Sequence, residues 1–347
     1  MRIVKALLAM AVLATGAVAI AAGSGPGDAP RLPYALYSYD EQLTLAGRLV
    51  QPEIETVRAA AVRREIERVR AAQTYQPQPA IWKISDADTT IYLFGTVHSL
   101  PPGFRWRNPA LEGVIVSADR LLLESVDDKN SDVTFREGIS AETLGTMPPL
   151  IERASPLYRA KLADIQKMLP PETVKQMDAM PTWIAAMGVG FIRDLLVGDM
   201  PSPGADDWLE QHFRATGKPI GAIEDSKLVV TNINAIPEAA QRLMLDAALA
   251  APDRTRAELD GPAHAWAQGE VGPGSPLIIV PEQLDPAGTM ADPLLVRRNG
   301  EWVDTLLGRE MTRPGTILFA AGAGHFVGPG SVIELLQKRG IRVERVQ

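Results

Sequence analysis

Short hydrophobic runs in the first half of this chain predict β-strands with a helix between them. Residues 80–85 and 90–94 are rich in β-branched and aromatic residues, and the polar turn 86–88 between them predicts a hairpin. Asn108 is placed to cap a helix, with Pro109 at its first position. The run 121–123 then predicts a strand, which we expect beside the strand 90–94. This order indicates a βαβ unit, so the sheet is at least partly parallel and buried on both faces.

The second half shows the same kind of pattern. Asp206 is placed to cap a helix that runs to Thr216 and stops at Gly217, and a short strand, 219–223, follows. Helices are expected around 238–250 and 255–268, before a loop rich in Gly and Pro at 272–293. The final unit is predicted to contain a helix (294–309), a strand (316–321), a glycine turn (322–325), a second helix (331–339) and a last strand (341–346).

Two stretches have helical periodicity without strand signals. Residues 39–76 predict one or two amphipathic helices, an arm outside the main domain that is also suited to binding a partner. Residues 137–202 predict a helical cap that is divided by prolines and holds six of the eleven methionines. Methionine is adaptable, so these side chains line a groove or fill ordinary helix cores.

The N-terminus resembles an export signal. Arg2 and Lys5 precede a short apolar run, and small residues near position 20 offer a cleavage site, which predicts a signal peptide over 1–22 and a flexible leader over 23–38. The alternative is an uncleaved anchor, but the apolar run is shorter than the ~20 residues that a span needs. We therefore expect a periplasmic or secreted protein without a membrane span after cleavage.

The composition limits which partners and which metal ligands the chain can have. Hydrophobic residues make up 46% of the chain, enough for a sizeable core. The net charge is −7, and it becomes −9 once Arg2 and Lys5 are removed, which argues against a nucleic-acid partner. There is no cysteine, so a bound metal would need His, Asp or Glu ligands. The oligomeric state does not follow from these features.

The most informative motif occurs twice. A strand leads into Gly95-Thr-Val-His98, and another leads into Gly322-Ala-Gly-His325; each histidine is followed at the fourth and fifth positions by Pro-Gly. Glycines at a strand end let the backbone turn sharply and approach a ligand, and open α/β sheets place their sites at this edge. Either histidine alone is adequately explained by packing, whereas the pair favours two half-sites that face each other. His212 and His264 lie in helical stretches and are interpreted as surface or packing residues.

Two further residues are candidates for the same site. Glu124 follows the strand 121–123, where it is a metal ligand, a general base or merely the first solvated residue. Two imidazoles and a carboxylate form a suitable ligand set for a divalent metal such as Mn, Co, Zn or Fe, and such a metal activates water near neutral pH. Arg298 is either a surface residue or a group that stabilises a developing oxyanion.

From about residue 80 to 346, the chain resembles the TraB/GumN family, which includes the Tiki-type metalloproteases. The matching segments, in order, are 95–103, 122–124, 204–206, 217–224, 298–299 and 322–328. The resemblance implies an α/β fold similar to that of erythromycin esterases, with a mixed central sheet flanked by helices and pseudo-symmetric halves, over residues 77–347. It also implies metal-dependent peptide cleavage by His98, His325 and Glu124, with Arg298 as a site residue. The possible cleft residues are Gly95, Asp206, Glu224 and Gly322.

The leading hypothesis is therefore a metal-dependent, peptidase-like hydrolase that acts on a peptide or a small molecule. Two alternatives stay open. One is a protein that binds a peptide or small ligand without turnover, and the other is a metal-independent esterase that uses histidine as its general base.

Overall fold

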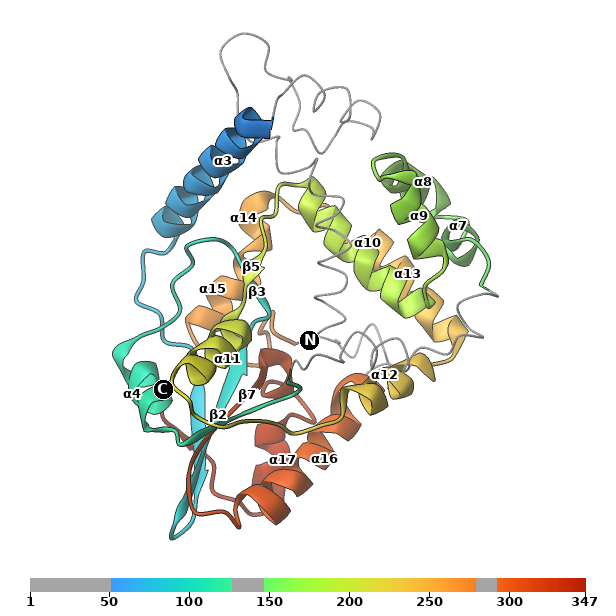
Figure 1. Ribbon diagram of the computed structural model, residues 1–347. Helices are drawn as coiled ribbons and strands as arrows, with labels where there is room; N and C mark the ends of the chain where they lie inside the picture. The colour runs from blue at the N-terminus through green and yellow to red at the C-terminus, as the bar shows by residue number, and fades with distance from the viewer. Residues whose placement is uncertain (1–50, 127–146, 279–291) are drawn as a thin grey trace.

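The computed structural model describes residues 51–126, 147–278 and 292–347 of the chain (Figure 1). The predicted signal peptide (1–22), leader (23–38), first part of the arm and first ten residues of the cap lie outside these ranges. In the described part, no helix combines the length and apolar character that crossing a membrane requires.

The centre of the fold is a mixed sheet, as predicted for an α/β protein. Six strands of the described residues pair in the order β6-β4-β7-β2-β1-β8. β2, β7, β4 and β6 are parallel, whereas β1 and β8 join antiparallel at one edge. The strands are β1 (Ile81–Ser85), β2 (Thr89–Thr96), β4 (Arg120–Leu123), β6 (Ile220–Ala222), β7 (Gly315–Gly322) and β8 (Glu344–Arg345). The predicted hairpin is confirmed as β1 and β2.

One predicted neighbour relation is wrong. We expected the strand that ends before Glu124 to pair with the His98 strand, but β7 lies between them and pairs in parallel with both. β7 is long, and its residues from Ile317 to Gly322 are all buried, so it is suited to the centre of a sheet that is covered on both faces. β2, α4 and β4 still form a βαβ unit, with one strand inserted.

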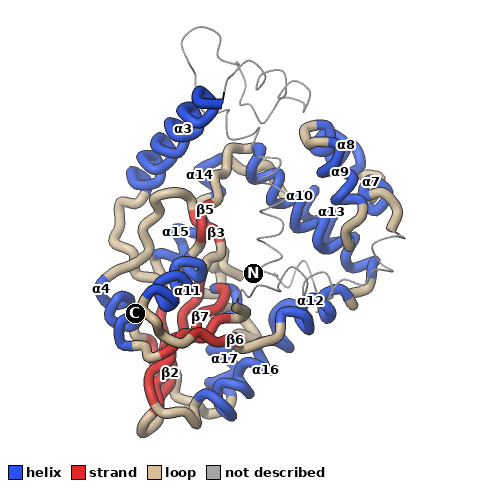
Figure 2. The backbone as a smooth tube through the Cα atoms, in the orientation of Figure 1, coloured by secondary structure: helices blue, strands red, loops and turns tan. Residues whose placement is uncertain are grey.

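Helices cover both faces of this sheet (Figure 2). On one face, α4 (Pro109–Ser117), α11 (Ala205–Ala215) and α15 (Gly261–Ala267) share a core with β2, β4 and β7. On the other face lie α16 (Arg297–Thr305) and α17 (Val332–Lys338), and π-helical turns at Asp292–Val296 and Leu306–Glu310 extend α16 at its two ends. The predicted cap of α4 is confirmed, because the Asn108 side chain accepts a hydrogen bond from the Leu111 N–H at 2.9 Å.

A second core belongs to the helical cap. α7 (Leu150–Arg153), α8 (Arg159–Lys167), α9 (Pro171–Asp178) and α10 (Thr182–Leu196) pack with α13 (Glu238–Ala250), which comes later in the chain. α12 (Ser226–Asn234) connects β6 to α13. Met168 and Met177 pack in this core, as ordinary helix packing predicts.

Four further elements complete the described part of the fold. β3 (Ser99–Leu100) follows His98 directly and pairs with β5 (Ser202–Pro203), which leads into α11. α14 (Arg256–Leu259) precedes α15, and α3 (Gln51–Ala72) is the described part of the predicted arm.

Candidate functional site

The two glycine–histidine segments leave the sheet side by side. β2 and β7 pair in register along their whole length, so Thr96 lies opposite Gly322. A Cβ at Gly95 would lie 2.9 Å from the Cα of Ala323, closer than side-chain and backbone atoms normally approach. Gly95 is therefore needed for contact between the two segments. The two segments are also alike at the Pro-Gly pair that follows each histidine. Gly103 and Gly330 both have positive φ angles, of 78° and 71°, which glycine adopts readily.

His325 is buried and held in one orientation. It lies in a 3₁₀ turn, with 4% of its surface exposed, and its Nδ1 is 2.6 Å from Oδ1 of Asn299. The amide of Asn299 also donates to the Gly330 carbonyl, so its oxygen faces the imidazole and accepts from Nδ1–H. Burial lowers the pKa of His325 to about 3. The ring is thus neutral, and its Nε2 carries a lone pair.

His98 has a different environment, because 29% of its side chain is exposed. Its Nδ1 lies 3.3 Å from Oδ1 of Asp206, near enough for an ion pair but without the angles of a hydrogen bond. Burial would lower the pKa of His98, but the carboxylates of Asp206 and Glu124 outweigh this effect and the pKa is raised. Asp206 and Asn299 therefore hold the Nδ1 sides of the two imidazoles.

The predicted capping role of Asp206 is wrong. Gly204 is the N-cap residue of α11, and neither carboxylate oxygen of Asp206 has a hydrogen-bond partner among the described residues. The start of α11 is instead fixed by close contact with the His98 segment. A Cβ at Gly204 would lie 2.1 Å from the Val97 oxygen, and the Ala205 N–H donates to that same oxygen at 3.0 Å. The absent side chain lets Asp206 approach His98.

Glu124 lies directly after β4 and is 7% exposed. Its Oε1 accepts from the Gly322 N–H at 2.6 Å and lies 3.9 Å from Nε2 of His325, while Oε2 accepts from Arg298 at 3.0 Å. Burial would raise the pKa of Glu124, but its basic neighbours, His325 and Arg298 foremost, outweigh this and hold the pKa well below its usual range. Glu124 is therefore an ionised carboxylate at the end of the central strands.

Arg298 joins Glu124 to Glu224. Its guanidinium donates to both oxygens of Glu224, at 3.0 and 2.6 Å, and to the Leu294 carbonyl at 2.9 Å. Trp302 donates from its indole to Glu224 at 2.8 Å, and the Arg298 guanidinium carbon lies 5.0 Å from the centre of that ring. Every nitrogen of the guanidinium thus already donates to an acceptor, so Arg298 orients Glu124 in this structure.

The structure brings the two histidines and Glu124 together around Gly322. The position that a Cβ of Gly322 would occupy is 3.2 Å from Glu124 Oε1, 3.4 Å from His98 Nε2 and 3.8 Å from His325 Cδ2. Of the other predicted cleft residues, Gly95 permits the close contact between the two glycine–histidine segments, and Asp206 faces His98. Glu224 is linked to Glu124 through Arg298.

The chemistry of these donors fits a divalent cation in part. Metal-binding histidines coordinate through one nitrogen while an acceptor holds the other, and the Nδ1 partners of His98 and His325 supply this arrangement. However, both oxygens of Glu124 already accept hydrogen bonds, and no three His, Asp or Glu side chains in the described ranges form a ready metal cluster. Glu124 would have to release Gly322 or Arg298 to become a ligand.

The sequence did not single out three residues that shape this site. Asn299 and Trp302, three residues apart on α16, hold His325 and Glu224. Trp302 lies four residues after Arg298, and this helical spacing is the signal that could have found it. Gly204 and Asn299 lie in the matching segments 204–206 and 298–299, but no role for either followed from the sequence. His212 stacks on Trp208 at 4.8 Å, and His264 Nδ1 lies 2.6 Å from the Tyr75 hydroxyl, so both pack outside this group as interpreted.

Comparison with known proteins identifies one relationship. The model of the TraB/PrgY/gumN family matches residues 80–345. Neither the curated proteins nor the solved structures gave a match.

Proposed function

This chain belongs to the TraB/PrgY/gumN family, and we propose that it is a metal-dependent hydrolase that cleaves peptide bonds or related bonds in small molecules. The proposed ligands are His98, His325 and Glu124. The observation that carries the proposal is the convergence of His98 Nε2, the His325 ring and Glu124 Oε1 around Gly322. The N-terminal sequence supports a periplasmic or secreted location, where the substrate would be met.

Each residue of the site has a part in this proposal. Asp206 orients His98, and Asn299 keeps the proton of His325 on Nδ1, so that both Nε2 atoms are free to coordinate. A divalent ion bound here would lower the pKa of a coordinated water and polarise the bond to be cleaved. Glu124 would have to release Gly322 or Arg298 before it could hold such an ion or serve as a general base.

Metal analysis of the purified protein tests the proposal. We expect stoichiometric Mn, Co, Zn or Fe in the wild type, and peptidase activity that a chelator removes and the metal restores. His98→Gln and His325→Gln should lose both the metal and the activity, whereas His212→Gln, whose ring stacks outside the site, should keep both. A wild type that binds none of these metals and gains no peptidase activity when they are added would refute the proposal.

The His98–Asp206 pair favours a second candidate, a metal-independent esterase. A partly exposed imidazole with a raised pKa and a buried carboxylate on its Nδ1 side is the arrangement of a general base. In that case ester hydrolysis would survive complete chelation and would be lost in Asp206→Asn. Loss of hydrolysis on chelation would exclude this candidate.

A further inference from the structure

Helix α3 lies outside the matched family region, yet it packs on the loop that follows His98. Val69 of α3 is fully buried in the core that also contains Phe104 and Trp106. Ile66 packs so closely on Gly103 that a Cβ there would lie 2.9 Å from it. The arm is therefore part of the structure around this loop.

Gln73, just after α3, holds the main chain of the same loop. Its side chain accepts from the Arg105 N–H and donates to the Arg105 carbonyl, both at 2.7 Å. The Arg105 side chain donates in return to the Gln73 carbonyl at 2.8 Å. Because Gln73 is only 2% exposed, water cannot easily replace these bonds.

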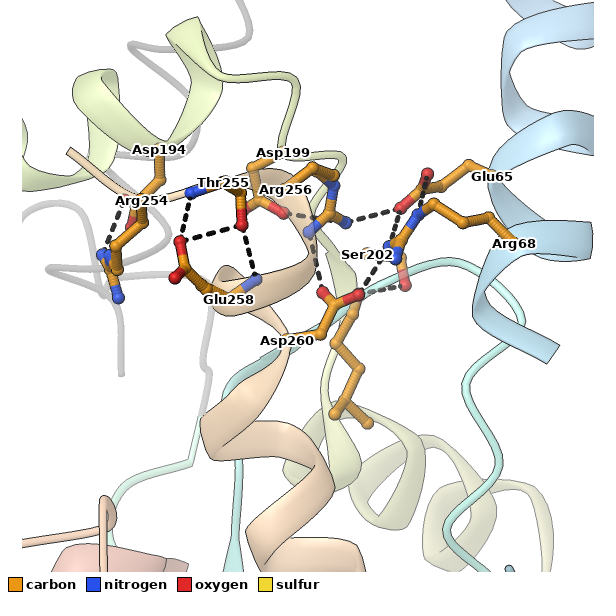
Figure 3. Close-up of polar contacts among 11 residues, drawn as sticks. Glu65, Arg68, Asp194, Asp199, Ser202, Arg254, Thr255, Arg256, Glu258 and Asp260 are labelled. Carbon is orange, nitrogen blue, oxygen red and sulfur yellow. Dashed lines mark hydrogen bonds and ion pairs between the residues drawn. The ribbon is translucent and has the colours of Figure 1, made fainter. Parts of the chain in front are cut away.

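A cluster of charged side chains fixes the other part of α3 (Figure 3). Glu65 accepts from Arg68 on the same helix and from Arg256 of α14, at 2.7 and 2.5 Å. Asp260, 4% exposed, accepts from both arginines. Arg256 also lies 3.2 Å from Asp199. Such buried charges depend on one another, since removing one leaves its partners unpaired.

This cluster joins α3 to two of the segments that connect the helical cap to the rest of the fold. Asp199 lies between α10 and β5, and β5 pairs with the strand that follows His98 before leading to Asp206. Arg256 and Asp260 lie where the chain returns from α13 to α15. Trp266 of α15 then donates to the Gly95 carbonyl at 2.7 Å. Contacts of α3 thus reach the surroundings of His98 by three routes.

We propose that α3 is a positioning element of the site, which acts through Glu65 and Gln73 to fix the His98 loop and the two cap segments that lead to β5 and to α15. Its effect on turnover rests on the proposed hydrolase function, whereas its effect on the geometry of His98 does not. α3 touches none of the reacting groups, so Glu65 and Gln73 act through His98 and Asp206.

NMR of ¹³C-labelled histidine rings in the full mature chain tests this proposal, because the chain has only four histidines to assign. The variants are Glu65→Gln and Gln73→Ala, and the matched control is Glu67→Gln on the exposed face of α3. We expect both variants to shift or broaden the His98 signal and to leave His212 unchanged. We also expect kcat to fall by about tenfold, with a smaller change in KM.

The outcomes separate the two proposals. The inference is overturned if Glu65→Gln and Gln73→Ala lower Tm but give the same His98 NMR signal as the control Glu67→Gln. In that case α3 has only a structural role. If the wild type hydrolyses nothing, the proposed function fails, yet the His98 signal still decides the role of α3. Should Gln73→Ala not fold, Gln73→Glu replaces it, since it keeps the acceptor for the Arg105 N–H.

Discussion

Replacing Gly204 by alanine tests how the site is assembled. The added Cβ would lie 2.1 Å from the Val97 oxygen and 2.4 Å from the His98 carbonyl carbon, so the two backbones must separate by about 1 Å to reach ordinary contact. The φ of Gly204 is −80°, which alanine adopts freely, so the cost is steric. Overpacking costs about 1–3 kcal/mol, and loss of the bond from Ala205 N–H to Val97 adds about 1 kcal/mol.

We therefore expect Gly204→Ala to lower the free energy of unfolding by about 2–4 kcal/mol, which in a domain of this size lowers Tm by roughly 4–7 °C. The separation also moves Asp206 away from His98, so activity should fall by about 100-fold. Calorimetry and initial rates measure the two effects.

Gly113→Ala is the matched control. Gly113 lies in the middle of α4, and a Cβ there would meet nothing within 4 Å. Alanine should therefore stabilise the protein by about 0.5–1 kcal/mol and leave activity unchanged. Equal Tm values for Gly204→Ala and wild type would refute the close packing of α11 on the His98 segment.

Three further predictions follow from the same structure. Gly322→Ala places a methyl group 3.2 Å from Glu124 Oε1 and 3.4 Å from His98 Nε2. Calorimetric titration should therefore show metal affinity reduced more than about tenfold, while Tm stays nearly constant. An unchanged affinity would contradict the convergence of these side chains at Gly322. The pKa of His325 is about 3 when folded and about 6.5 when unfolded, so its contribution to stability is complete above pH 6.5 and is lost as pH falls toward 3. Urea unfolding of the metal-free protein should show about 2 kcal/mol of this loss by pH 5, and His325→Gln should remove that part of the slope; identical slopes would disprove the neutral buried state. Arg153 is 2% exposed and donates to three main-chain carbonyls of the cap. Arg153→Met should therefore lower the free energy of unfolding by about 2–4 kcal/mol and speed hydrogen exchange in the cap helices before it does so in the sheet. Equal changes in cap and sheet would show that the cap does not unfold separately.

Local signals predicted most of the elements. The Asn108-Pro109 start of α4, the glycine end of α11 and the hairpin before His98 all depend on residues that are adjacent in sequence, and the structure contains each of them. The repeated glycine–histidine motif was also informative, because both copies end strands that pair in register. Pattern within a short segment was therefore sufficient for these features.

Non-local packing explains the errors. The order of strands depends on which strand is buried on both faces, and the sequence of β4 does not reveal that β7 separates it from β2. Asp206 has the residue type and position of a helix cap, yet the approach of Gly204 to Val97 turns its carboxylate toward His98. The pairing of Asn299 with His325 likewise arises only when α16 packs on the sheet.

The position of β7 has a consequence for the order in which the molecule folds. Residues 315–322 are made only after β2 and β4, which are complete some 190 residues earlier, yet they lie between these two strands. Until they arrive, β2 and β4 each have an open edge, which makes the partial chain prone to aggregation, and the proposed ligand His325 is absent. Insertion of β7 joins β2 to β4 and supplies His325 in one step, so the proposed site forms only when the sheet is complete.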